Sequence, residues 1–106
     1  MKNCIRAAVM ILLSASIAAP AIAQSAGAAV YKEKCQMCHG PDGTAATPMG
    51  KMMKIPSFKS PAARKKTEAQ YIAITENGMG RMPSYKGKLT AMQIKEVVSY
   101  IRTLQK

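Results

Sequence analysis

Histidine, acidic residues and tryptophan are scarce in this chain of 106 residues. It has one histidine, no tryptophan, and five acidic residues against 16 basic ones. Side chains for general acid–base catalysis are therefore almost missing, and we do not expect the chain to be an enzyme. Cysteine is also rare, with three residues in all, so a fold built on several disulfides is excluded. No internal repeat or low-complexity segment is visible either.

Residues 1–23 have the pattern of an export signal. Lys2 and Arg6 give a positively charged start, and residues 7–19 are an apolar run interrupted only by serines. The segment Ala21-Ile22-Ala23 has the small-x-small pattern of a cleavage site. The apolar run is shorter than the roughly 20 residues that a membrane-spanning helix needs. We therefore expect a cleaved signal peptide, a periplasmic protein and no stable membrane insertion; a retained N-terminal anchor is the alternative.

The mature chain, residues 24–106, would then be a single small domain. A domain of this size buries a limited share of its surface and usually needs a disulfide, a metal or another crosslink. Cys4 would be removed with the signal peptide, so Cys35 and Cys38 would be the remaining cysteines. A group attached to these two residues would supply both the crosslink and part of the core.

The two cysteines belong to the segment Cys35-Gln36-Met37-Cys38-His39. This C-x-x-C-H pattern is the attachment site of a c-type haem, in which each thiol adds to a vinyl group and the histidine binds the iron. A thioredoxin-like redox pair would need a βαβ setting, which the sequence does not indicate. A zinc site would need four ligands, and no second Cys/His cluster is present. The sequence therefore predicts one haem c, bound covalently through Cys35 and Cys38.

The predicted fold is all-α, with three main helices at about 26–35, 67–77 and 90–104. The last two begin with a Thr-x-x-Gln capping box, and the last has a strong helical repeat of apolar residues. Glycines and prolines interrupt residues 40–61, where we expect a long loop with a short helical turn at 51–54. Long ordered loops in small domains usually enclose something, and a haem fits.

The ligand on the second face of the iron cannot be a histidine of this chain, because His39 is the only one. Methionine, lysine, water or no ligand remain. Met82 is the preferred methionine, because it lies in a glycine-rich loop between two helices and Pro83 stiffens the backbone after it. Met79, three residues earlier and flanked by glycines, is the alternative.

The combined pattern resembles the small class I bacterial c-type cytochromes, particularly the short forms called cytochrome c551/c552 or c6-like. It consists of G-x3-Y-x3-C-x-x-C-H-G, a proline-rich loop, G-x-x-x-M-P-x-Y and an amphipathic C-terminal helix containing Tyr-Ile. The resemblance covers residues 24–106. It implies the cytochrome c fold, in which three main helices and loops wrap around one covalently attached haem.

The resemblance also implies roles for particular residues. Cys35 and Cys38 would carry the thioether bonds, while His39 and Met82 would ligate the iron. The carbonyl of Pro48 would accept a hydrogen bond from the second nitrogen of the ligand histidine and so orient its ring. The first and last helices would cross, with Gly27 and Tyr31 facing Tyr100.

These features predict a soluble, exported, monomeric one-electron carrier of a respiratory or related electron-transport chain. A histidine and a methionine together fill both axial positions, which suits electron transfer better than catalysis. Without Lys2 and Arg6 the net charge falls from +11 to +9. Basic residues flank the Met82 loop, so we expect acidic redox partner proteins and no nucleic acid. The alternative explanation of the positive charge is that it keeps a small protein soluble. Two alternatives remain: an electron-entry subunit of a larger dehydrogenase or oxidase, and a ligand-binding haem domain with a displaceable methionine.

Overall fold

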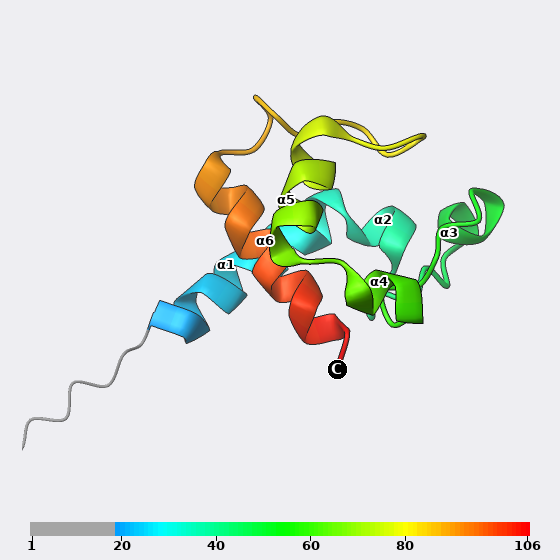
Figure 1. Cartoon of the computed structure of the whole chain (residues 1–106), viewed down its shortest axis with the longest axis horizontal. Helices are drawn as coiled ribbons and strands as arrows, with labels where there is room; N and C mark the ends of the chain where they lie inside the picture. Colours follow the sequence, from blue (N-terminus) through cyan, green and yellow to red (C-terminus); the bar gives the residue numbers. More distant parts are fainter. Residues whose placement is uncertain (1–18) are drawn as a thin grey trace, which may run out of the picture.

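The computed structural model describes residues 19–106, so most of the predicted signal peptide lies outside the described residues. Six helices follow one another in this part of the chain: α1 (Ala19–Lys34), α2 (Gln36–His39), α3 (Pro48–Met52), α4 (Pro61–Lys65), α5 (Glu68–Asn77) and α6 (Ala91–Leu104) (Figure 1). Between residues 19 and 106 there is no β-strand, only two isolated β-bridges. The predicted all-α fold is confirmed.

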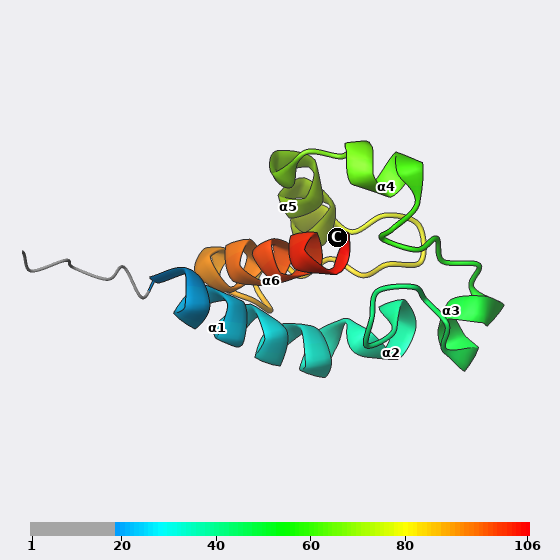
Figure 2. The same cartoon turned by 90° about the horizontal axis from the view of Figure 1, so that it is seen from below.

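Helices α1 and α6 pack closely against each other, with α1 along one edge of the molecule (Figure 2). Gly27 of α1 lies so near the backbone of Glu96 in α6 that a Cβ atom at this position would overlap the Glu96 carbonyl. One turn further on, the ring of Tyr31 packs against that of Tyr100, with 5.2 Å between the ring centroids. The contact between the first and last helices that the resemblance implied is therefore present.

The core lies between α6, α1 and α5. Helix α6 buries Ile94, Val97, Val98 and Ile101, of which the two valines are 0% exposed. Full burial of each such side chain contributes about 1.5–3 kcal/mol to the stability of the fold. Both predicted capping boxes are present, since Thr67 and Thr90 each exchange hydrogen bonds with the glutamine three residues later. These caps fix where α5 and α6 begin.

The remaining helices differ from the expectation. Helix α1 is already formed at Ala19, the first described residue, rather than only from 26, since the alanine-rich sequence from Ala19 to Ala29 favours a helix. Helices α2 and α4 were not predicted. The expected turn at 51–54 is instead α3, which starts at Pro48 after the N-cap Thr47. Among the described residues, no helix has both the length and the apolar character needed to cross a membrane.

Candidate haem-binding site

A cavity of about 450 Å³ brings together segments that are far apart in the sequence. One wall is the end of α1 with the C-x-x-C-H segment, and another is the loop that follows α5. In both ribbon views this loop, drawn in yellow, projects from α5 on the side where α2 and α3 lie (Figures 1 and 2). The lining residues are mostly apolar, and they are Lys34, Cys35, Cys38, His39, Met53, Lys54, Ile55, Pro56, Lys66, Tyr71, Ile74, Met79, Arg81, Met82, Pro83 and Tyr85.

Helix α2 delivers His39 to this cavity. The backbone N–H of His39 donates to the carbonyl of Cys35, and the imidazole ring stacks on Phe58 with 4.6 Å between centroids and 16° between planes. Burial lowers the pKa of His39, so the ring is neutral near pH 7. Neutral imidazole is the form that binds a metal ion. The His39 Nδ1 atom is buried and has no hydrogen-bond partner, which is rare for a buried polar atom.

The resemblance implied a hydrogen bond between His39 and the Pro48 carbonyl, but the Nδ1 atom of His39 has no partner among the described residues, so this bond is not formed in the structure. Pro48 is nevertheless held beside the C-x-x-C-H segment. The hydroxyl of the preceding residue, Thr47, donates to the carbonyl of Met37 over 2.8 Å. Its Oγ1 also accepts a hydrogen bond from the Gly50 N–H and so caps α3.

Cys35 and Cys38 are both free thiols that line the cavity. Burial, with a smaller contribution from the neighbouring Cys38, raises the pKa of Cys35 to about 11. A thioredoxin-like redox pair needs a βαβ setting, and the residues that the structure describes contain no β-strand. Among the residues that the structure describes, no three His, Cys, Asp or Glu side chains converge to hold a metal ion, so a zinc cluster is not seen there.

The loop after α5 presents Met79 and Met82. Gly78, which ends α5, has a φ of 77°, and a Cβ atom there would crowd the backbone of Met82 and Ser84. Glycine at this position therefore allows the sharp turn by which the chain leaves the helix. The loop returns to α5 through hydrogen bonds from the Tyr85 N–H to the Thr75 carbonyl and from the Lys86 N–H to the Glu76 carbonyl. These bonds give the methionines a defined position.

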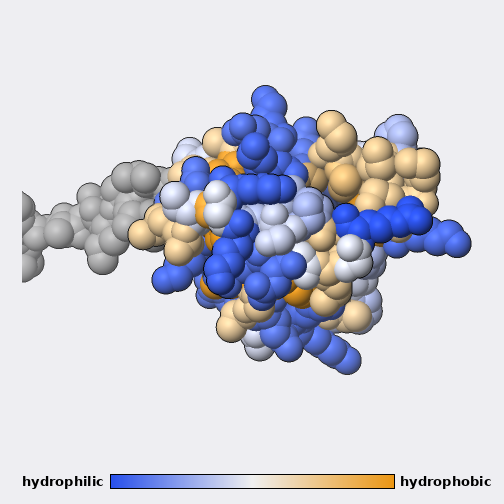
Figure 3. Space-filling model, turned by 90° about the horizontal axis from the view of Figure 1, so that it is seen from above, coloured by the Kyte–Doolittle hydropathy of each residue, from blue (hydrophilic) through white to orange (hydrophobic). Residues whose placement is uncertain are grey.

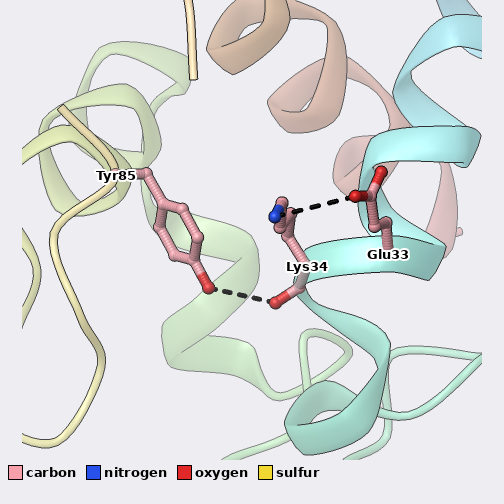
Figure 4. Close-up of polar contacts among 3 residues, drawn as sticks. All are labelled: Glu33, Lys34 and Tyr85. Atoms are coloured by element: carbon pink, nitrogen blue, oxygen red, sulfur yellow. Dashed lines mark hydrogen bonds and ion pairs between the residues drawn. The ribbon is translucent and has the colours of Figure 1, made fainter. Parts of the chain in front are cut away.

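Tyr85 joins the two walls of the cavity. Its hydroxyl donates to the carbonyl of Lys34, the last residue of α1, over 3.0 Å (Figure 4). The same figure shows the side chain of Lys34 paired with Glu33 at 3.7 Å. Neither Tyr85 nor Phe58 was predicted from the sequence as a part of the site. The one sequence signal for Tyr85 was its place as the tyrosine of the M-P-x-Y pattern.

The charged residues at the cavity are basic. Among the described residues, its lining includes Lys34, Lys54, Lys66 and Arg81 but no Asp or Glu. Hydrophilic side chains cover much of the face that carries the loop after α5, with apolar atoms between them (Figure 3). The cavity therefore combines apolar walls, two thiols, an imidazole, thioethers and a basic surrounding. This set of groups fits a haem.

The fold and the site define the chain as a small c-type cytochrome. It belongs to the family described as "Cytochrome C oxidase, cbb3-type, subunit III", whose model matches residues 23–101. Proteins of this class carry a covalently bound haem.

Two similar relatives and one solved structure agree with this assignment. The chain is 31% identical over 80 residues to cytochrome c6 of Leptolyngbya boryana, covering 73% of this chain and 87% of the relative. It is 29% identical over 75 residues to cytochrome c6 of Synechocystis sp. (strain ATCC 27184 / PCC 6803 / Kazusa), covering 71% of this chain but only 60% of that relative. The solved structure of KustC0563 c-type cytochrome superposes with a TM-score of 0.69 at 28% identity, covering 76% of this chain and 98% of the other.

Proposed function

We propose that the protein is an exported one-electron carrier with one haem c, attached through Cys35 and Cys38 and ligated by His39 and Met82. The observation that carries this proposal is the shared cavity, which joins the C-x-x-C-H segment to a methionine loop more than 40 residues later. The cytochrome c6 relatives support the same function. When bound, the haem supplies a one-electron couple whose reduced state a thioether ligand favours.

The residues of the chain would hold, orient and shield that group. Cys35, directly after α1, and Cys38, in α2, would attach it, and the stacked Phe58 limits the rotation of the His39 ring. Met82 would close the opposite face, held by a loop whose backbone is hydrogen-bonded to α5. Two protein ligands would leave no open position for water or small molecules, which suits electron transfer.

Pro48 keeps its proposed role as the acceptor that orients the histidine. The unpaired Nδ1 of His39 supports a need for such a partner, because a buried N–H without one is costly by about 1–3 kcal/mol. The bonds from Thr47 hold Pro48 next to the C-x-x-C-H segment, as this role requires.

Export and partner choice complete the proposal. Residues 1–23 would be removed as a signal peptide, leaving residues 24–106 in the periplasm. The positive residues lining the cavity would attract acidic redox partners and speed their encounter at low ionic strength. The same charge gives no reason to invoke nucleic acid in an exported protein.

A second candidate is a cytochrome subunit that stays attached to a larger dehydrogenase or oxidase. One observation favours it: the family is described as a subunit of an oxidase. Sedimentation of the native protein from a mild extract separates the two, since a free carrier stays near the mass of its own chain. The third reading, a ligand-binding haem domain, needs a methionine loop that opens easily, whereas Tyr85 ties this loop to α1.

The proposal is tested by the intact mass of the protein produced in cells that mature c-type cytochromes. We expect the mass of residues 24–106 plus one haem. Replacing Cys35 and Cys38 with alanine should remove the haem mass, whereas Cys4→Ala, the control, should leave the mature mass unchanged because Cys4 is cleaved off. A covalent haem that survives loss of both cysteines, or a mature protein that retains Cys4, would contradict the assignment.

A further inference from the structure

We infer that Met79 is a second thioether ligand for the same site, so that either Met79 or Met82 can occupy the position opposite His39. This inference rests on the proposed function, because it requires a haem in the cavity. It goes further, because it assigns two sulfur ligands to a position that ordinarily has one.

The first support is the backbone pairing of the two methionines. The N–H of Met79 donates to the carbonyl of Met82 over 3.2 Å, and the N–H of Met82 donates to the carbonyl of Met79 over 2.9 Å. The residues thus form an isolated antiparallel bridge in which each is directly opposite the other. Residues paired in this way lie about 5.5 Å apart at their Cα atoms and project their side chains to the same face.

The second support is that both side chains line the cavity. Methionines elsewhere on the surface, at positions 37, 52 and 92, are as exposed as Met79 but are not part of the lining. Met79 is 61% exposed and Met82 is half-buried. Met82 is therefore the resting ligand, and Met79 stands at the rim as the second.

The third support is the freedom of the turn between them. Gly80 has a φ of 56°, and a Cβ atom built on it would meet nothing within 4 Å, so the tip of the turn is not packed against other described residues at this position. A methionine side chain has three rotatable bonds and adapts to irregular sites. A small change at the tip can therefore bring either sulfur forward while the backbone pairing is kept.

This arrangement would keep the site closed when one sulfur is lost. An exposed methionine is the one more readily oxidised to a sulfoxide, which is polar and a different ligand. With two thioethers on one face, damage to either leaves the other in place. The pair would thus protect the six-coordinate state on which electron transfer depends.

The test uses the holoprotein and three variants: Met82→Leu, Met79→Leu and the double variant. Leucine removes the sulfur but nearly conserves the side-chain volume, so the fold should be retained. The readouts are the far-red sulfur–iron band of the ferric form and carbon monoxide binding by the ferrous form. We expect both single variants to keep the band and the double variant to lose it and bind carbon monoxide. Met92→Leu is the control, since Met92 is 64% exposed and lies outside the cavity.

The outcomes separate this inference from the proposed function. If Met82→Leu alone loses the band as completely as the double variant, Met79 does not ligate, while the proposed function stands. If Met79→Leu alone loses it, Met82 cannot substitute, and the inference is equally overturned. If the band persists in the double variant, the sulfur ligand lies elsewhere, for example at Met53 in the same cavity, and the inference is overturned. If the wild-type protein lacks the band, the proposed function itself is overturned. Alanine versions repeat the test if the leucine pair does not fold.

Discussion

We expect the hydrogen bond between Tyr85 and Lys34 to set how tightly the methionine loop is closed. It spans 51 residues of sequence and connects this loop to the residue directly before Cys35. The Lys34 carbonyl is at the C-terminal end of α1, where helical carbonyls lack a partner within the helix. Tyr85→Phe removes the hydroxyl and keeps the ring, so the variant breaks this bond and little else.

The size of the effect follows from the nature of the bond. A neutral hydrogen bond contributes about 0.5–1.5 kcal/mol to the state that contains it, and this one is solvent-accessible, so water can satisfy the freed carbonyl. We therefore take about 1 kcal/mol. Since 1.4 kcal/mol corresponds to a factor of ten, the ratio of open to closed loop should rise about fivefold.

The assay is an equilibrium titration of the ferric holoprotein with imidazole, which under the proposed ligation has to displace the methionine to bind. Because binding requires the open loop, the affinity for imidazole should rise about fivefold in Tyr85→Phe. Tyr100→Phe is the matched control, because Tyr100 packs on Tyr31 at the contact between α1 and α6. An unchanged affinity in Tyr85→Phe, or an equal rise in the control, would refute the reasoning.

Three further predictions concern packing, ionisation and charge. Gly27→Ala should lower the free energy of unfolding by about 1–3 kcal/mol in a denaturant titration, because the alanine Cβ would overlap the Glu96 backbone. Helix propensity alone would make the variant more stable, so a gain in stability would contradict the close contact. Burial raises the pKa of Tyr31 above that of a tyrosine in the unfolded chain. Above about pH 10 the unfolded chain loses this proton while the folded protein keeps it, so the free energy of unfolding falls as the pH rises above this value. Tyr31→Phe should make this fall less steep, and an identical slope would exclude the contribution. Replacing Lys86 and Lys88 with glutamate should slow reduction by an acidic partner at low salt, with the difference shrinking at high salt; equal rates at low salt would remove the steering.

The parts of the fold that local sequence determines were predictable. Helices α5 and α6 begin where their threonine and glutamine caps predicted, because a capping box acts within four residues. The apolar repeat of α6 predicted its buried face, including Val97 and Val98. The contact of Gly27 with α6 was predicted through the resemblance, which supplied information that the periodicity alone does not contain.

Short helices and long-range contacts were not predictable in the same way. Helix α4 is five residues long, too short for an apolar period, although Ser60 and Pro61 have the cap and first-turn pattern that could have marked it. The stacking of Phe58 on His39 and the bond from Tyr85 to Lys34 join distant segments. Such contacts depend on how the loops pack, and no local pattern encodes them.

The candidate site was partly predictable for the same reason. The sequence identified the C-x-x-C-H segment and a methionine loop, and the structure lines one cavity with both. It did not reveal that Met79 and Met82 pair across a tight turn, since spacing alone treats them as competitors. The ligand roles of His39 and Met82 stay predictions that need the bound haem.

The most direct test of the account is the visible absorption spectrum of the purified mature protein, ferric and ferrous, with and without carbon monoxide. Ligation by His39 and a methionine sulfur predicts a narrow low-spin ferrous α-band, a weak far-red band in the ferric form and no response to carbon monoxide. A high-spin spectrum, or ready binding of carbon monoxide, would show an open distal face and contradict the electron-carrier account.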